Sequence, residues 1–285
     1  MPKHKLVFEA IGTHWSIETT VILDEQIEGA ILRRVATFDK TYSRFRKDSL
    51  VSRIARRPGI YTFPEDMERL FSFYEQLYEV TDEKVTLLIG GMLEKAGYDA
   101  EYSFVPSRQQ TMPKIEDVMV RNGIVLEVKS PVVIDVGAAG KGYLVDLVCG
   151  ILDSFEIDEY VVDASGDLRH KGIQRNTVGL EHPLDVSKII GMIDVQNSSF
   201  CASATNRRQW ANGQHHIFDP TLMAPTREII ATWVMADTAM VADGLATALF
   251  FTDPMRLREL CAYDYVRMHG DGSIDYSPAF KGKLF

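Results

Sequence analysis

The feature that most constrains this fold is a β-branched run that stops at small residues and passes straight into a helical pattern. Residues 132–136 read Val-Val-Ile-Asp-Val, and residues 137–142 read Gly-Ala-Ala-Gly-Lys-Gly. This order predicts a strand over residues 131–136, a tight turn, and a helix with an apolar stripe from Tyr143 to Leu152. Small residues at such a junction let backbone N–H groups approach an anion, and the helix N-terminus adds partial positive charge. Lys141 can neutralise that anion, so the stretch indicates a phosphate-bearing ligand; a turn that serves only packing is the alternative.

Both strand-like and helix-like patterns occur along the rest of the chain. Helical spacing predicts helices over residues 25–39, from Met67 to Tyr78, over residues 240–251, and from Asp253 to about Ala262. Alternation and β-branched runs predict a hairpin within residues 6–23, a closing strand from Tyr265, and strands over residues 124–128, 159–163, 188–195 and 229–236. Residues 98–113 lack a period and indicate a loop.

These elements follow one another without a regular βαβ order, which favours an α+β fold over a Rossmann sheet. A chain of 285 residues is long enough to bury a large core. We expect residues 1–285 to form a single large two-lobed domain of mixed or antiparallel sheets with flanking helices.

Composition excludes several classes of protein. The net charge of −9 argues against a nucleic-acid binder, because there is no basic surplus to replace phosphate counterions. No apolar run approaches the length of a membrane span, and the N-terminus shows neither a signal peptide nor a lipoprotein cysteine. The three cysteines are widely spaced among apolar residues and indicate free thiols. We therefore expect a cytoplasmic protein without a membrane span.

Two further segments carry candidate chemistry. Asp243 and Thr247 are four residues apart in an otherwise apolar helical pattern, so they share one face. A hard cation such as Mg²⁺ would use both oxygens; the alternative is that Asp243 caps the helix and Thr247 bonds back to a carbonyl. The pair His215-His216 precedes Asp219-Pro220 and indicates either an ordinary turn or a general base beside a phosphate.

Taken together and in order, several short motifs resemble the ApbE family, the FAD:protein FMN transferases. The family's Asp-Leu-Gly-Gly-Ile-Ala-Lys-Gly-Tyr pattern is similar to residues 135–143, and its His-Ile-Ile-Asp-Pro to residues 216–220. Further similar motifs lie at residues 11–13, 43–49, 163–169, 201–204 and 242–249. The resemblance implies an ApbE-like (T-fold-like) domain over almost the whole chain.

The chain also departs from the family pattern. Residues 82–88 read Asp-Glu-Lys-Val-Thr-Leu-Leu where the family usually has Gly-Gly-Ala-Phe-Asp-Pro-Thr, so an Asp near the flavin nucleotide is lost. Ala246 stands before the metal-binding Thr and removes a possible extra oxygen. The chain is therefore identified as a divergent member.

The resemblance implies roles for ten residues. Mg²⁺ would be held by Asp243, Thr247 and the backbone carbonyl of Gly140, and Lys141 would support the same FAD pyrophosphate. A Thr or Ser hydroxyl of a partner protein would attack the FMN phosphorus with His216 as base, and AMP would leave. The residues expected to line the flavin or adenine are Ile11, Phe45, Thr86, Gly137 and Phe218.

Three functions remain open at this point. The first is Mg²⁺-dependent transfer of FMN from FAD to a protein. The second is hydrolysis of FAD to FMN and AMP, with water in place of the hydroxyl. The third is a flavin-binding protein without catalysis, which the lost Asp near Thr86 motivates.

Overall fold

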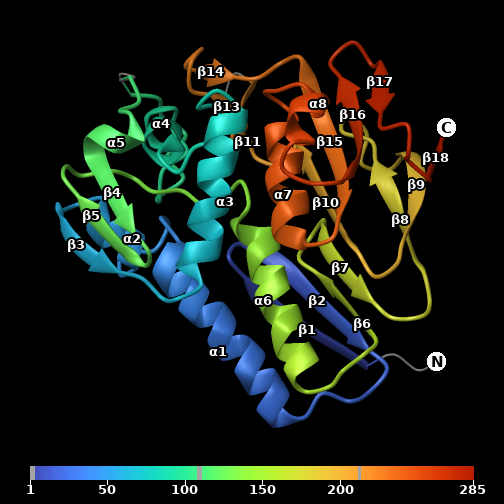
Figure 1. Cartoon of the computed structure of the whole chain (residues 1–285). Coiled ribbons are helices and arrows are strands. Elements are labelled where there is room, and N and C mark those ends of the chain that lie inside the picture. Colours follow the sequence, from blue (N-terminus) through green and yellow to red (C-terminus); the bar gives the residue numbers. More distant parts are fainter. Residues whose placement is uncertain (1–3, 108–110, 211–212) are drawn as a thin grey trace. The chain divides into compact units, whose positions relative to one another are not determined.

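A computed structural model describes residues 4–107, 111–210 and 213–285, and the chain divides into two compact units. Unit 1 comprises Met1–Ala36, Ala139–Arg207 and Arg227–Phe285. Unit 2 comprises Thr37–Ala138 and Arg208–Thr226. Each unit therefore draws on segments that are distant in the sequence, and each has its own sheets and helices (Figure 1).

Unit 1 is built on an eight-stranded antiparallel sheet in the order β1-β2-β6-β7-β10-β15-β16-β17 (Figure 1). Its strands are β1 (His4–Ala10), β2 (Thr13–Thr19), β6 (Tyr160–Asp163), β7 (Asp167–Lys171), β10 (Ser199–Ala204), β15 (Ile229–Ala236), β16 (Asp264–His269) and β17 (Ile274–Tyr276). A three-stranded sheet is added by β8 (Asn176–Glu181), β9 (Ile189–Val195) and β18 (Lys283–Leu284).

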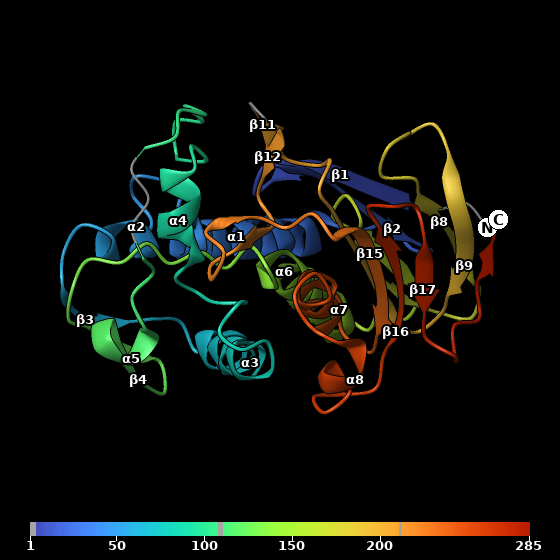
Figure 2. The same ribbon diagram turned by 90° about the horizontal axis from the view of Figure 1, so that it is seen from above.

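Two helices, α6 (Gly140–Ser154) and α7 (Ala239–Ala248), pack against each other and against strands of the large sheet (Figure 2). The alternation of strand side chains assigns the two faces. Thr232 of β15 donates a hydrogen bond to the Ala246 carbonyl of α7 at 2.6 Å. Its neighbour Trp233 instead joins an apolar core with Leu180 and Ile193 of the three-stranded sheet. The large sheet is therefore covered by helices on one face and by the small sheet on the other.

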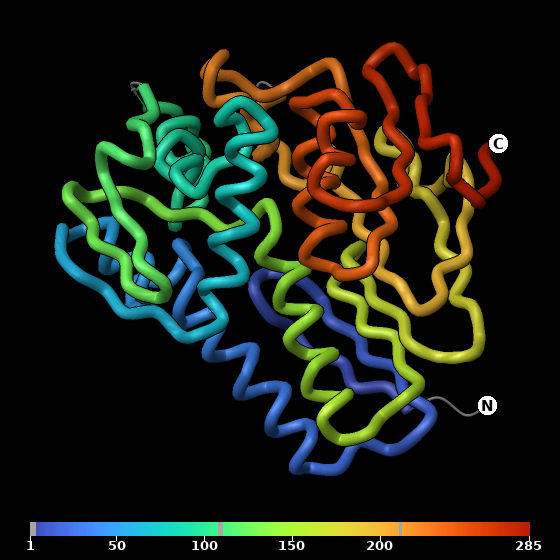
Figure 3. The backbone as a smooth tube through the Cα atoms, viewed as in Figure 1, coloured from blue at the N-terminus to red at the C-terminus, as the bar shows by residue number. Residues whose placement is uncertain are grey.

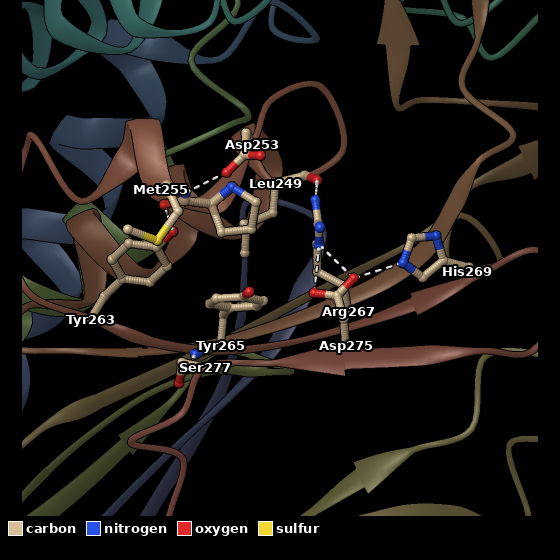
Figure 4. Close-up of polar contacts among 10 residues, drawn as sticks. Leu249, Asp253, Met255, Tyr263, Tyr265, Arg267, His269, Asp275 and Ser277 are labelled. Atoms are coloured by element: carbon tan, nitrogen blue, oxygen red, sulfur yellow. Dashed lines mark hydrogen bonds and ion pairs between the residues drawn. The ribbon is translucent and has the colours of Figure 1, made fainter.

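The segment after α7 is tied together by polar contacts (Figure 4). Asp253 caps the short helix α8 (Pro254–Leu257) by accepting the Met255 N–H at 2.7 Å. Side chains also join strands β16 and β17: Asp275 of β17 accepts hydrogen bonds from Arg267 and His269 of β16. Burial raises the pKa of Asp275, but these hydrogen bonds outweigh it and hold the pKa below its ordinary value.

Unit 2 contains α2 (Leu50–Ile54), α3 (Met67–Val80), α4 (Ile89–Lys95) and α5 (Ile115–Val118), and α1 (Glu25–Tyr42) enters it from unit 1. A sheet in the order β3-β5-β4 is formed by β3 (Gly59–Thr62), β5 (Val125–Val128) and β4 (Met119–Asn122). Two small strand pairs complete it: β11 (Gln209–Trp210) with β12 (Gln214–His215), and β13 (Phe218–Asp219) with β14 (Ala224–Pro225).

The predicted α+β fold with antiparallel sheets and flanking helices is confirmed. The strand predicted over residues 131–136 is wrong: these residues run extended before α6 but belong to none of the described sheets (Figure 3). The helix predicted from Asp253 to about Ala262 is also too long, because α8 ends at Leu257. Within the described residues, no helix is both long and apolar enough to cross a membrane.

Candidate functional site

Helices α6 and α7 each supply a carboxylate that accepts backbone N–H groups from the first turn of the other helix. Asp146 of α6 accepts the N–H groups of Ala239 and Met240 at the start of α7, both at 2.9 Å. In return, Asp243 of α7 accepts the N–H of Gly142 in the first turn of α6 at 2.9 Å. First-turn N–H groups lack partners within their own helix, and the helix dipole favours negative charge there. The exchange therefore fixes the register between the two helices.

Gly142 permits this close approach of the two helices. A Cβ at this position would lie 2.1 Å from the carbonyl oxygen of Ala239 and 2.7 Å from the Cβ of Asp243. Any side chain would therefore push α7 away from the first turn of α6. In the Gly-Lys-Gly sequence, Gly142 therefore serves the contact between the two helices.

A buried cluster of charged groups lies beside the contact between the two helices. Lys141 places its Nζ 2.7 Å from Asp167 of β7 and donates a hydrogen bond to the Ala164 carbonyl at 3.0 Å. Asp167 and Asp243 are both buried, at 0% and 4% exposure. Two carboxylates thus face one ammonium group in the interior.

The pKa values in this cluster reflect that imbalance. Burial lowers the pKa of Lys141, but the charges of Asp167 and Asp243 outweigh it and raise the pKa above its ordinary value. Burial and the neighbouring Asp167 raise the pKa of Asp243 well above its ordinary value. The two carboxylates therefore share one counter-charge, which disfavours the ionised form of Asp243.

Sequence reasoning did not single out Asp167. Its signal is weak, because an acid at the first position of a strand is an ordinary surface pattern. Only the fold shows that β7 brings this acid under Lys141 of α6. Asp167 is the one charged member of the cluster that was not predicted.

The donor set around α6 and α7 suits a hard cation. Asp243 and Thr247 lie one helical turn apart in α7, and Gly140 is the first residue of α6. Carboxylate, hydroxyl and carbonyl oxygens are the ligands that Mg²⁺ prefers. In the part of the chain that the structure describes, no group of three or more His, Cys, Asp and Glu side chains could hold a metal. A site here would therefore combine one or two carboxylates with hydroxyl, backbone and substrate oxygens.

Asp243 does not cap its own helix, so the alternative in which this residue is only a helix cap is wrong. The cap of α7 is Thr238, whose side chain accepts the Val241 N–H. Asp243 lies in the middle of α7 and binds the first turn of α6 instead.

Ile11, another candidate residue of unit 1, lies in the turn between β1 and β2 with φ of 46°. This left-handed conformation is unusual for a β-branched residue.

The other candidates belong to unit 2. The Phe45 ring stacks on Tyr102 at 5.4 Å, and the Arg44 guanidinium lies 4.2 Å from its centre. Phe218 is 2% exposed and packs in an apolar cluster with Met92 and other residues of unit 2. Its ring is a core group in this structure.

Two more candidates shape local turns of unit 2. The Thr86 hydroxyl accepts the N–H of Leu88, just before α4 begins. Gly137 donates its N–H to Asp135 at 2.6 Å. Asp135 also pairs with Arg44 at 2.5 Å, so this carboxylate organises the segment that leads to α6.

His216 is half-buried between β12 and β13. Its Nδ1 is buried and has no hydrogen-bond partner among the described residues. Burial, followed by the charges of Arg208 and His215, lowers the pKa of His216 to about 3. The ring is therefore neutral at pH 7 and able to accept a proton. Asp219, three residues on, accepts two N–H groups of its own turn and thereby orients it.

The ten predicted residues thus divide between the two units. Unit 1 holds Ile11, Gly140, Lys141, Asp243 and Thr247, and unit 2 holds Phe45, Thr86, Gly137, His216 and Phe218. Within unit 1, the fold brings Lys141 and Asp243 into one charged cluster at the start of α6. The assigned roles of all ten residues stay predictions.

Comparison with known proteins gives a consistent result. The profile described as the ApbE family matches residues 11–268. The chain is 25% identical to a FAD:protein FMN transferase of Vibrio cholerae over 225 aligned positions, which cover 73% of this chain and 67% of that protein. It is 26% identical to one of Haemophilus influenzae over 291 aligned positions, which cover 90% of this chain and 82% of that protein.

Solved structures share the fold. The ApbE protein of Thermotoga maritima superposes with a TM-score of 0.85 at 24% identity, over 98% of each chain. The flavin transferase ApbE of Vibrio cholerae gives a TM-score of 0.77 at 20% identity, over 98% of this chain and 99% of that one. The similarity extends over both units.

Proposed function

Because the chain belongs to the ApbE family, we propose that it is a Mg²⁺-dependent FAD:protein FMN transferase that acts on a Thr or Ser hydroxyl of a partner protein and releases AMP. The family predicted from the sequence motifs is confirmed by the match over residues 11–268. Curated relatives across most of the chain are FAD:protein FMN transferases. The observation that carries the proposal is the buried cluster of Lys141, Asp167 and Asp243 at the start of α6.

This cluster supports binding of a cation together with a phosphate anion. Asp243, Thr247 and the carbonyl of Gly140 would hold Mg²⁺, and Asp167 adds negative charge beside them. The Lys141 ammonium and the N-terminus of α6 offer positive charge to the FAD pyrophosphate. When bound, Mg²⁺ neutralises the negative charge that develops on the leaving AMP.

The transfer exchanges one P–O bond for another. The acceptor hydroxyl oxygen forms a bond to the FMN phosphorus, the bond to the AMP oxygen breaks, and AMP leaves with that electron pair. The hydroxyl proton passes to the imidazole of His216, which is neutral at pH 7. A pKa near 3 makes His216 a weak base in the free protein. The phosphate charges of bound FAD would raise this pKa, since an opposite charge favours the protonated ring.

The test is incubation of the full chain with FAD, MgCl₂ and a set of candidate acceptor proteins. Intact mass spectrometry of the acceptor should show addition of one FMN phosphoryl group at Thr or Ser, and AMP should appear in equal amount. EDTA should abolish both products. AMP release without acceptor modification would instead assign FAD hydrolysis, and FAD binding without either product would assign a flavin-binding protein.

A matched pair of variants separates the site from general effects of charge. Asp243→Asn should remove activity, whereas Asp158→Asn should not, because Asp158 is an exposed carboxylate of the same unit. A second readout is the Mg²⁺-dependent rise in melting temperature without FAD. A ligand present at about 100 times its Kd stabilises the folded state by about 2.7 kcal/mol. This rise should vanish in Asp243→Asn and persist in Asp158→Asn.

A further inference from the structure

Two adjacent arginines follow strand β10 and differ in their contacts. Arg207 is exposed, and its Nη2 pairs with Glu181 at 2.9 Å. Arg208 is half-buried, and its guanidinium has neither an ion pair nor a hydrogen bond in the described part of the chain. A charge that is partly withdrawn from water without a counter-ion is unfavourable. The Arg208 guanidinium is therefore suited to pair with an anion that enters from outside.

The strand pair β11–β12 places Arg208 beside His216 (Figure 2). Gln209 of β11 pairs with His215 of β12 in antiparallel register. An antiparallel register moves one residue back on one strand for each residue forward on the other, so Arg208 and His216 occupy the next opposing position. A hydrogen bond between the His216 ring and the Arg208 backbone agrees with this placement.

The charge of Arg208 acts on several groups of unit 2. Burial lowers the pKa of His216 most, and the charge of Arg208 is the next cause. His215 acts on the His216 pKa in the same direction, and Asp135 acts in the opposite one. The charge of Arg208 also acts on Tyr98 and Asp135. All of these groups belong to unit 2, so the guanidinium is close to the proposed base and to its surroundings.

The proposed role of His216 determines where the substrate phosphate would lie. The acceptor hydroxyl has to be within hydrogen-bond reach of the base that takes its proton. The oxygen of the same hydroxyl forms the new bond to the FMN phosphorus. The non-bridging oxygens of this phosphoryl group are then only a few bond lengths from the proton that His216 accepts, on the part of unit 2 that also carries Arg208.

We propose that Arg208 binds the non-bridging oxygens of the FMN phosphoryl group of FAD, as a further substrate-contacting residue. This inference rests on the proposed transfer reaction. A guanidinium group offers several N–H donors in a planar fork that matches phosphate oxygens. Arg208 stays protonated throughout and holds the phosphoryl group while one P–O bond replaces the other. Its pairing with the phosphate also offsets the effect of its charge on His216, which helps this base to accept a proton.

The test compares FMN, riboflavin and AMP as ligands of the full chain in MgCl₂, by titration calorimetry. FMN and riboflavin differ only in the phosphate, so a contact to this phosphate affects FMN alone. Arg208→Gln should weaken FMN binding about ten- to a hundredfold, the range for a hydrogen bond to a charged group, and should leave riboflavin and AMP binding unchanged. Arg208→Lys keeps the positive charge and should weaken FMN binding less than Arg208→Gln does.

Arg207→Gln is the matched control, because it removes the neighbouring arginine, whose partner is Glu181. Its affinities for all three ligands should equal those of the unmodified chain. The proposal is overturned if both variants weaken FMN binding equally, or if Arg208→Gln weakens riboflavin as much as FMN. It is also overturned if Arg208→Gln weakens AMP in place of FMN, or if the unmodified chain binds FMN no more tightly than riboflavin.

Incubation with FAD, MgCl₂ and acceptor proteins separates this inference from the proposed function. Arg208→Gln should lower kcat for FMN transfer about 10²–10³-fold, as loss of one preorganised donor does. If FMN binding depends on Arg208 but the unmodified chain modifies no acceptor, the transferase is refuted and the phosphate contact stands. If the unmodified chain transfers FMN and Arg208→Gln does so equally fast, the contact is refuted and the transferase stands.

Discussion

Replacing Lys141 with Met should strongly destabilise unit 1 in the absence of a metal ion. Methionine keeps the length and apolar stem of lysine but removes the ammonium group that lies 2.7 Å from Asp167. The side chains of Lys141 and Asp167 are 19% and 1% exposed, so solvent compensates little for the lost charge. Asp167 and Asp243 would then remain as two buried carboxylates without a counter-charge.

The magnitude follows from that burial. Removing one partner of a buried ion pair costs about 3–5 kcal/mol, because the other charge stays buried and uncompensated. The total free energy of unfolding of a domain is only about 5–15 kcal/mol. Lys141→Met should therefore lower the unfolding free energy by a large fraction of the total. Urea denaturation in EDTA, followed by circular dichroism, measures this loss.

The double variant Lys141→Met/Asp167→Asn tests the reason for the loss. It removes both partners and returns the cluster to the net charge of the original, with Asp243 as its charged member. We expect it to be more stable than Lys141→Met alone, with a coupling energy above about 1 kcal/mol, as contacting groups show. A Lys141→Met protein within about 1 kcal/mol of the original, the size of an exposed pair, would refute the argument that this pair is buried and essential.

Three further changes have directions set by the structure. Gly142→Ala places a Cβ 2.1 Å from the Ala239 carbonyl and should lower the unfolding free energy by about 1–3 kcal/mol in urea denaturation. His216→Gln should slow FMN transfer by about 10²–10⁴-fold, as loss of a general base does, while FAD binding measured by fluorescence stays unchanged. Asp275→Asn tests pH dependence: the native pKa of Asp275 lies below the unfolded value of about 3.9, so its stabilisation is present above that pH and lost in acid. Denaturation should show this variant to be less stable at pH 7, by less than about 1 kcal/mol because the side chain is 36% exposed. The difference from the original should shrink as the pH falls through the native pKa of Asp275.

The failure at residues 131–136 shows what a local pattern can and cannot establish. The alternation of burial is real, because Val132, Ile134 and Val136 are all buried. The segment is also extended, but the N–H of Asp135 donates a single backbone hydrogen bond, to the carbonyl of Leu87. β-Branched residues favour an extended and buried backbone, and pairing requires a neighbouring strand that the local sequence does not specify.

The site shows the same division between local and distant information. Asp243 and Thr247 were identified because helical spacing relates residues four positions apart. Asp167 was missed, since its importance depends on contact with Lys141, which is 26 positions earlier and on a different element. Gly142 was noticed only as part of a small-residue string. A glycine is required there because the backbone of Ala239, which is distant in sequence, lies too close to leave room for a Cβ.

Asp243 has two carboxylate oxygens, and this allows a structural role and a metal-binding role to coexist. Its Oδ2 accepts the Gly142 N–H at 2.9 Å, and in our proposal its other oxygen contacts the cation. Asp243→Asn keeps a carbonyl oxygen for Gly142 and removes one excess negative charge, so stability in EDTA should equal or exceed that of the original. Asp243→Ala leaves the buried N–H unpaired and should cost about 1–3 kcal/mol. Urea denaturation and Mg²⁺ titration of both variants separate the roles: both should lose Mg²⁺ binding, but only Asp243→Ala should lose stability. If Asp243→Asn is destabilised as much as Asp243→Ala, the charge itself holds α6 and α7 together, and the division of roles between the two oxygens is wrong.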